Sequence, residues 1–272
     1  RKSLSRLAAL QGSIALKMPL SAYRSLLPAL SYGAWLRIRM QFARTLLGSS
    51  WIGLSALLTM SVLGTIYGTL TGVEDWSSYW VYVALGIVSW NTLATALMSS
   101  CTVLERSRER LLNQPMPIGV VVLEEWLTTS LTLLIALTAV LLVMGLLEPQ
   151  LWGHVLMGGW LGLLNLMLGC LWLTLLIAPI AVSIADIQQL MPVLLQIGFL
   201  SSPILFYRQS LGSMSWITNL NPLYAWVRLA RDPFLGHPHW GIQTLVIVSQ
   251  IILAVLLLIR LDKKRMKVIR WL

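Results

Sequence analysis

The chain has 272 residues, of which 57% are hydrophobic and 11% are charged, and its formal net charge is +10. Soluble domains carry about 25% charged residues, so this composition excludes an ordinary soluble domain and indicates a protein embedded in lipid. Basic segments beside a membrane account for the positive charge, so the charge does not indicate a nucleic-acid partner.

Six apolar stretches set the expected fold. A helix needs roughly 20 apolar residues to cross the hydrocarbon core of a bilayer, and six stretches approach this length. We therefore predict an all-α integral membrane protein with about six transmembrane helices in one membrane domain. In chain order, the predicted helices are Leu47–Leu70, Trp80–Leu104, Ile118–Leu146, Val155–Ile177, Leu190–Tyr207 and Ile242–Ile259.

The distribution of lysine and arginine predicts the orientation of these helices. With the N-terminus inside, 17 of the 20 basic residues lie on the cytoplasmic side. The opposite side holds Arg208, Arg228 and Arg231. Because basic loops stay in the cytoplasm, we place both termini there and expect a multi-pass protein of the cytoplasmic (inner) membrane.

The N-terminal region is predicted to lie on the membrane surface. Residues 1–30 are expected to form a loosely ordered cytoplasmic lead-in, without a cleaved signal peptide, before a transmembrane domain over residues 31–272. Tyr32–Leu46 reads as an amphipathic interfacial helix; the alternative is a basic flank that anchors the first span. The apolar stripe would be Trp35, Ile38, Phe42 and Leu46, opposite Arg37, Gln41 and Arg44.

A densely charged segment joins the second and third predicted spans. Glu105 to Arg110 reads Glu-Arg-Ser-Arg-Glu-Arg, and Pro115 and Pro117 end the helix that it would form. The segment is either a solvated turn or a docking surface for a soluble partner.

Two adjacent carboxylates, Glu124 and Glu125, fall inside the third apolar stretch. A charge at the bilayer centre costs about 2.5–3.5 kcal/mol. One reading is that the span begins deeper than drawn, which leaves both carboxylates at the cytoplasmic interface beside Arg106 and Arg110. The other is a structural or gating ion pair that faces the interior of the bundle.

The connection 208–241 is too apolar for a solvated loop, since it holds three tryptophans and many aliphatic residues. Asn221 and Pro222 divide it in two. We predict two short helices that re-enter the outer half of the membrane, where protein or a water-filled cavity must surround them. The pairs Gly64/Gly68 and Gly158/Gly162 have the spacing that allows close helix packing.

Signals for catalysis are absent from the sequence. There is no phosphate-binding loop, no H-E-x-x-H and no G-x-S-x-G pattern, and Cys101 and Cys170 are interpreted as packing residues. His154, His237 and His239 are interpreted as surface residues, so we expect no metal site. The chain is therefore predicted to be a non-enzymatic subunit whose energy source lies in another protein.

Three blocks of sequence, in order and spacing, resemble one family. The resemblance covers about residues 30–260 and is to ABC-2 type permeases that export O-antigen, capsule and teichoic-acid polymers. That family usually has arginine where this chain has Ala185. The blocks are Arg44–Trp51; Leu85–Asn91 with Pro115–Pro117; and Ala185–Ile187 with Ser202–Tyr207, Asn221–Pro222, Arg228 and Gly236.

The resemblance implies a homodimer that binds two copies of a soluble ATPase, and the ATPase would bind ATP and Mg. It also implies a channel for an undecaprenyl-linked glycan and an external gate between the fifth and sixth spans. The ATPase-coupling residues would be Arg37, Arg44, Glu105, Arg106, Arg108, Glu109 and Arg110. The gate residues would be Pro203, Asn221, Pro222, Trp226 and Arg228.

Sugars stack on aromatic rings, so we also predict glycan contacts at Trp51, Trp90 and Tyr207. Packing is the competing explanation for Trp90, and an interfacial aromatic belt is the competing explanation for Trp51 and Tyr207. Among functions, the alternatives are an ABC-2 permease for a drug or small lipid, a polyprenyl-phosphate glycosyltransferase and a secondary transporter. The glycosyltransferase needs clustered acidic residues, and only Glu124 and Glu125 approach that pattern.

Overall fold

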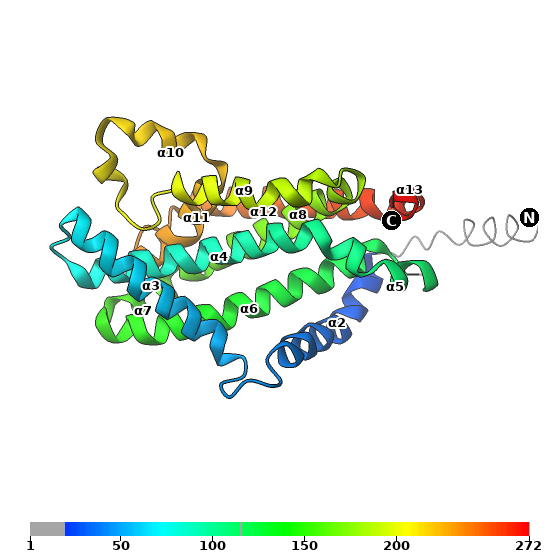
Figure 1. The fold of residues 1–272 in the computed structure, drawn as a ribbon, viewed down its shortest axis with the longest axis horizontal. Helices are drawn as coiled ribbons and strands as arrows, with labels where there is room; N and C mark the ends of the chain where they lie inside the picture. The colour runs from blue at the N-terminus through cyan, green and yellow to red at the C-terminus, as the bar shows by residue number, and fades with distance from the viewer. Residues whose placement is uncertain (1–19, 115, 272) are drawn as a thin grey trace, which may run out of the picture.

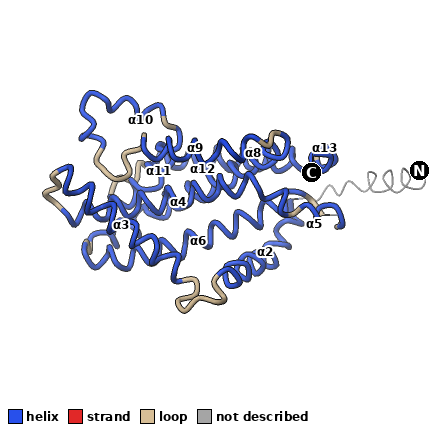
Figure 2. Tube along the Cα trace, viewed as in Figure 1, coloured by secondary structure: helices blue, strands red, loops and turns tan. Residues whose placement is uncertain are grey.

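The computed structural model describes residues 20–114 and 116–271, and these residues form helices joined by short connections (Figures 1 and 2). The prediction of an all-α membrane protein is confirmed. Within the described residues, five helical runs are long and apolar enough to cross a bilayer. They are α3 (Ser50–Thr71), α4 (Trp76–Arg106), α6 (Ile118–Leu147), α7 to α8 (Gln150–Ser183) and α12 (Trp240–Lys263).

The two ends of the bundle differ in charge. The short helices α5 (Arg108–Asn113) and α13 (Arg265–Trp271) lie at one end, which we call the basic end (Figure 1). The α3–α4 connection and α7 (Gln150–His154) lie at the other, which we call the opposite end. At the opposite end Asp75 caps α4 by accepting hydrogen bonds from Ser77 and Ser78, and bonds from Ser78 and Ser77 lower the pKa of this carboxyl.

The fourth span is longer than predicted. It starts with α7, continues through a π-helical turn, η1 (Val155–Gly159), and ends with α8 (Trp160–Ser183). Two of the predicted close approaches are observed, one on α8 and one on α3. The outer face of Gly162 meets the backbone of Ala230, and Gly64 on α3 meets the ring of Trp80, so neither position has room for a larger side chain.

The sixth crossing is made by a short helix and a non-helical segment. Since α8 ends at Ser183 at the basic end and α12 begins at the opposite end, the chain must cross between them. Helix α9 (Asp186–Leu200) has 15 residues. It rises about 22 Å, against a hydrocarbon core of about 30 Å. The predicted fifth span, Leu190–Tyr207, is therefore wrong at both ends, and residues 201–207 leave the helix; we call them the unwound segment.

The N-terminal helix also differs from its prediction. Helix α2 is Leu20–Gln41, so the described part of the predicted loose lead-in is helical, and residues 42–46 are turns. Its buried face is Leu30, Ala34 and Ile38, which packs toward α6, while Trp35 and Leu46 are exposed. The spacing of four residues in the buried set places these side chains on one face, and the predicted stripe through Phe42 and Leu46 is wrong because the helix ends first.

The connection between α9 and α12 folds as a chain of short helices. It begins with the 3₁₀ segment η2 (Arg208–Trp216) and α10 (Ile217–Leu220), followed by α11 (Pro222–Arg231) and η3 (Asp232–Leu235). Helix α11 packs against both α4 and α8, and Tyr224, Val227 and Ala230 form its buried face. Two short helices were predicted, and α11 has the packed surroundings expected of a re-entrant helix.

Candidate functional site

Five charged side chains from four helices meet at the basic end, and we call them the arginine–glutamate cluster. Arg37 of α2 bridges the two carboxylates of α6. Its two terminal nitrogens lie 2.5 Å from Glu124 Oε1 and 2.7 Å from Glu125 Oε2. Arg106, at the end of α4, lies 3.2 Å from Glu125 Oε1, and Arg110 of α5 lies 3.0 Å from Glu124 Oε2. Each of the four carboxylate oxygens therefore accepts one charge-assisted hydrogen bond.

The cluster is asymmetric in its exposure to solvent. Glu124 and Glu125 are 8% and 7% exposed, whereas the side chains of the three arginines are 36–54% exposed. Buried carboxylates need paired donors, and exposed guanidinium groups retain access to water. Helix α6 begins at Ile118 as predicted, and the depth of the two glutamates in the membrane stays a prediction. They do lie beside Arg106 and Arg110, and they form ion pairs that tie α2, α4 and α5 to α6.

The structure brings together three of the seven residues predicted to couple to an ATPase, namely Arg37, Arg106 and Arg110. The other four are exposed, and no ion pair involves them within the described ranges. They are Arg44 in the turn after α2, Glu105 at the end of α4, and Arg108 and Glu109 in α5. Both groups lie on elements that could contact a soluble partner, and their role in coupling stays a prediction.

At the opposite end, side chains of α4 hold the unwound segment. The hydroxyl of Tyr79 donates to the carbonyl of Leu205 at 2.6 Å, and the hydroxyl of Tyr82 donates to the carbonyl of Pro203 at 2.7 Å. Backbone that leaves a helix inside a membrane needs such partners, because lipid supplies none. The two tyrosines therefore let the chain leave helical geometry while it remains packed in the bundle.

Asn221 joins the same segment to α11. Its amide nitrogen donates to the carbonyl of Gly198 at 2.8 Å and to the hydroxyls of Ser201 and Ser202 at 2.9 and 2.8 Å. Its amide oxygen accepts from the backbone nitrogens of Leu223 and Tyr224, which caps α11. Pro222 occupies the first turn, where a missing N–H costs nothing. One side chain thus fixes the end of α9 to the start of α11.

Arg231 is the residue in this region that the sequence analysis did not select. It is 2% exposed, its guanidinium carbon lies 3.6 Å from the centre of the Tyr82 ring, and it donates to the carbonyl of Pro203 at 3.4 Å. Arg228 was selected instead, and it is an exposed residue that pairs with Asp232 at 2.9 Å. Helical spacing offered a signal for Arg231, since Val227 and Ala230 precede it by four and one residues and lie on the buried face of α11.

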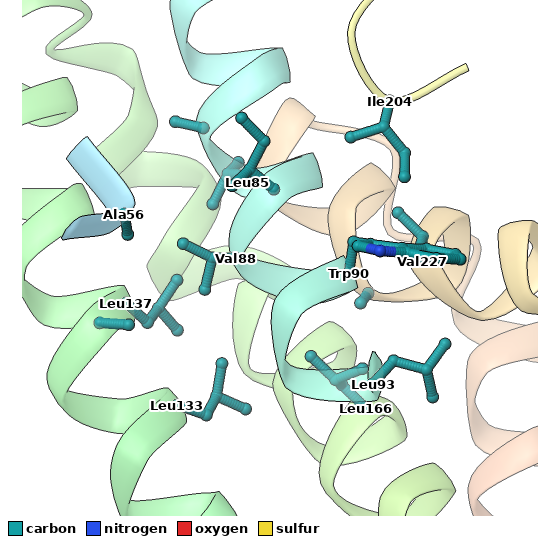
Figure 3. Close-up of a cluster of buried hydrophobic side chains, with 14 of the residues drawn as sticks. Ala56, Leu85, Val88, Trp90, Leu93, Leu133, Leu137, Leu166, Ile204 and Val227 are labelled. Carbon is teal, nitrogen blue, oxygen red and sulfur yellow. The ribbon is translucent and has the colours of Figure 1, made fainter. Parts of the chain in front are cut away.

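The aromatic residues predicted to contact a glycan are dispersed. Trp90 is buried and packs on Phe199 of α9 with 5.6 Å between ring centres, and Figure 3 shows its ring on the side of α4 that faces Val227, away from Leu133. Tyr207 packs against Tyr82 with 4.7 Å between ring centres and 55° between the ring planes. Trp51 is exposed at the start of α3. Their roles as glycan contacts stay predictions. The predicted gate residue Trp226 packs on Trp172.

A groove of about 150 Å³ lies between α3, α4 and α6 near the middle of the bundle. Most of its lining side chains bear a hydroxyl or an amide, so we call it the hydroxyl groove. The exposed amide of Asn91 lies halfway along α4. Polar groups at this depth contact water, protein or substrate more favourably than acyl chains. The polar lining residues are Ser55, Thr59, Asn91, Thr92, Thr95, Thr129 and Thr132.

No group of three or more histidine, cysteine, aspartate or glutamate residues is arranged to hold a metal ion in residues 20–114 and 116–271. A family model described as "ABC-2 type transporter" matches residues 32–235, which is most of the chain. A comparison with curated proteins found no significant match. The matched range contains the arginine–glutamate cluster, the hydroxyl groove and the unwound segment.

Proposed function

Because the chain belongs to the ABC-2 type transporter family, and is thus a membrane subunit of an ABC exporter, we propose that it exports lipid-linked polysaccharide as a homodimer. Membership implies a partner that hydrolyses ATP. The polymer would be of the O-antigen, capsule or teichoic-acid type, and each of the two subunits would bind one ATPase. The membrane is the cytoplasmic one, with the basic end inside, because basic segments remain in the cytoplasm.

The arginine–glutamate cluster supports the coupling part of this proposal. It connects the two elements that flank the cytoplasmic surface, α2 and α5, to the long span α6 through bonds of 2.5–3.0 Å. A partner that displaces α2 or α5 therefore also exerts a force on α6, because the ion pairs resist separation. Movement produced by ATP hydrolysis could reach the spans by this route without a long flexible linker.

The observation that carries the choice of substrate is the contrast between α3 and α12. Both spans have one broad exposed face. The exposed face of α12 is mainly aliphatic, including Leu245, Val248 and Ile252, with two exposed hydroxyls at Thr244 and Ser249. That of α3 instead mixes apolar side chains with hydroxyls; the exposed hydroxyl residues on α3 include Ser55, Thr59, Ser61, Thr65 and Thr69. Lipid suits the first face, whereas a polar path suits the second.

The hydroxyl groove extends this polar face toward α4 and α6. A polysaccharide presents many hydroxyls together with apolar C–H faces. Most of the groove hydroxyls donate to carbonyls of their own helices and can therefore accept hydrogen bonds from each successive sugar, and the exposed amide of Asn91 can also donate. Trp51, exposed on α3, adds a ring for stacking. In the proposed homodimer, the two α3 faces and the two grooves enclose the path.

The substrate is tested with the complex purified from native membranes and placed in nanodiscs. ATP hydrolysis is measured with an undecaprenyl-pyrophosphate-linked glycan, a short-chain lipid and a hydrophobic dye. We expect stimulation of several-fold by the glycan alone. Stimulation by the dye or the short-chain lipid, without an effect of the glycan, would identify a drug or small-lipid permease instead.

The path is tested by removing polarity without removing bulk. Thr59→Leu and Asn91→Leu make the spans more apolar, so membrane insertion should not suffer. We expect polymer export to fall at least tenfold while the complex remains assembled. Ser249→Leu is the matched control, because Ser249 is an exposed hydroxyl on α12, and it should export normally. Equal export by all three variants would exclude the groove from the path.

A further inference from the structure

A second hollow, of about 250 Å³, lies at the basic end between α8, α12 and α13, and we call it the basic hollow. Its inner wall is aliphatic and includes Leu175, Pro179 and Leu257. Its rim carries three cations, Arg260, Lys264 and Lys267. The hollow is distinct from the hydroxyl groove, which lies between α3, α4 and α6.

The three cations of the rim have no anionic partner in the described part of the chain. All three are exposed, and none takes part in the ion pairs formed there. No carboxylate among the described side chains lines the hollow. The neighbouring Asp262 accepts a hydrogen bond from the backbone nitrogen of Gly119 on α6 and so is directed elsewhere. Three like charges around one opening favour an anion with multiple acceptor oxygens.

The apolar wall indicates that this anion has a hydrocarbon tail. Leu175 and Ser183 both line the hollow and are eight residues apart on α8, which corresponds to about 12 Å along the helix axis. The hollow therefore runs from the level of the headgroups into the hydrocarbon layer. Leu257 and Leu261 of α12 line the hollow, and Leu256 and Ile259 on the same helix are exposed apolar side chains that suit contact with acyl chains.

From this arrangement we propose that the basic hollow is a binding site for an anionic membrane phospholipid. The phosphate lies among Arg260, Lys264 and Lys267, and one acyl chain lies against Leu175 and Leu257. Basic pockets between spans on the cytoplasmic side suit anionic lipid headgroups. Trp271 closes the outer edge of the hollow, with Lys267 Nζ 5.1 Å from the centre of its ring. The lipid joins α13 to α8, since it contacts residues of both.

The test is lipid retention by the detergent-purified full chain, measured by native mass spectrometry. The probes are phosphatidylglycerol and phosphatidylcholine with the same acyl chains, with inorganic phosphate and undecaprenyl pyrophosphate as competitors. We expect phosphatidylglycerol to be retained at least tenfold better than phosphatidylcholine. Lys264→Gln with Lys267→Gln should lower its retention at least tenfold. The matched double control is Lys263→Gln with Arg270→Gln, which removes the same charge outside the hollow and should retain lipid normally.

A second variant tests the contribution of the apolar wall independently of the charges. Leu176→Trp fills the hollow without altering charge, and we expect it also to lower phosphatidylglycerol retention. If the matched double control loses as much phosphatidylglycerol retention as Lys264→Gln with Lys267→Gln, retention depends on general surface charge, and the site is overturned. Displacement by inorganic phosphate at equal concentration would overturn the requirement for a tail. Displacement by undecaprenyl pyrophosphate, without competition from added phosphatidylglycerol, would make this a site for the lipid carrier instead.

Discussion

The bundle holds a non-spanning element at each end, and it does so with different chemistry. At the basic end, ion pairs of Glu124 and Glu125 hold α2 and α5. At the opposite end, hydrogen bonds from Tyr79, Tyr82 and Asn221 hold the unwound segment and α11, and most of these donors are uncharged. Ion pairs weaken when water and salt reach them, whereas neutral hydrogen bonds are less sensitive to salt. The comparison teaches that the attachment at the basic end can respond to charge and that the attachment at the opposite end is set by geometry.

The largest expected effect is at the arginine–glutamate cluster. Arg37→Ala leaves two nearly buried carboxylates with one arginine each, and we expect a loss of about 2–4 kcal/mol of stability. Thermal unfolding of the purified complex measures the loss. Arg39→Ala is the matched control, because Arg39 is an exposed residue on the same helix, and no ion pair involves it in the described part of the chain. Equal stability of the two variants would show that α2 is held by its apolar face alone.

A smaller loss is expected at the opposite end. Asn221→Ala removes the cap of α11 and the two amide hydrogens that the carbonyl of Gly198 and the hydroxyls of Ser201 and Ser202 share, for an expected cost of about 1–3 kcal/mol. Asn221→Asp keeps an acceptor for the cap but cannot donate to the carbonyl of Gly198, so its stability should lie between those of wild type and the alanine variant. Thermal unfolding ranks the three proteins. Wild-type stability of the aspartate variant would mean that the donated bonds contribute nothing.

Tyr82→Phe makes the comparison sharper, because it removes a single hydroxyl and keeps the ring beneath Arg231. The expected cost is about 1 kcal/mol, the usual contribution of one hydrogen bond. Tyr67→Phe is the control, since the ring of Tyr67 stacks on Phe206 and no hydrogen bond of its hydroxyl occurs among the described residues. A loss in the control as large as that in Tyr82→Phe would assign the effect to packing.

The smallest expected effect is a difference in salt dependence between the ion pairs at the basic end and the hydrogen bonds at the opposite end. The difference in stability between wild type and Arg37→Ala should shrink as ionic strength rises from about 0.05 to 0.5 M, because the arginine side chains reach solvent. The difference between wild type and Tyr82→Phe should stay constant over the same range. Thermal unfolding of the three proteins at several salt concentrations tests both statements, and parallel salt curves would contradict the proposed difference in chemistry.

The spans could be predicted from sequence because each is defined by local composition. Helices α3, α4, α6 and α12 lie close to their predicted ranges. The end of α9 was misplaced although Pro203 gave a signal, since a residue before proline disfavours helical geometry. An unbroken apolar run therefore did not mean an unbroken helix.

The site residues could not all be predicted, because the sites are formed by contacts between distant parts of the chain. Arg37 is 88 residues from Glu125, and the spacing of residues along one helix cannot reveal such a partner. The sequence did place Glu124 and Glu125 beside Arg106 and Arg110, because the connection between those elements is short. Arg231 was missed because its burial arises from the packing of α11 between α4 and α8, and no local pattern records which neighbours a helix will meet.

The shortness of α9 has a consequence for the surrounding bilayer. Helix α6, with 30 residues, is about 45 Å long, whereas α9 is about 22 Å long. Leu190, Val193, Leu194, Ile197 and Leu200 are exposed along α9 and form its apolar surface. This surface falls roughly 8 Å short of an average hydrocarbon thickness. Thinner lipid beside α9 would match this surface, and a polar headgroup that moves along this helix would then cross a shorter hydrocarbon layer than one that moves along α6.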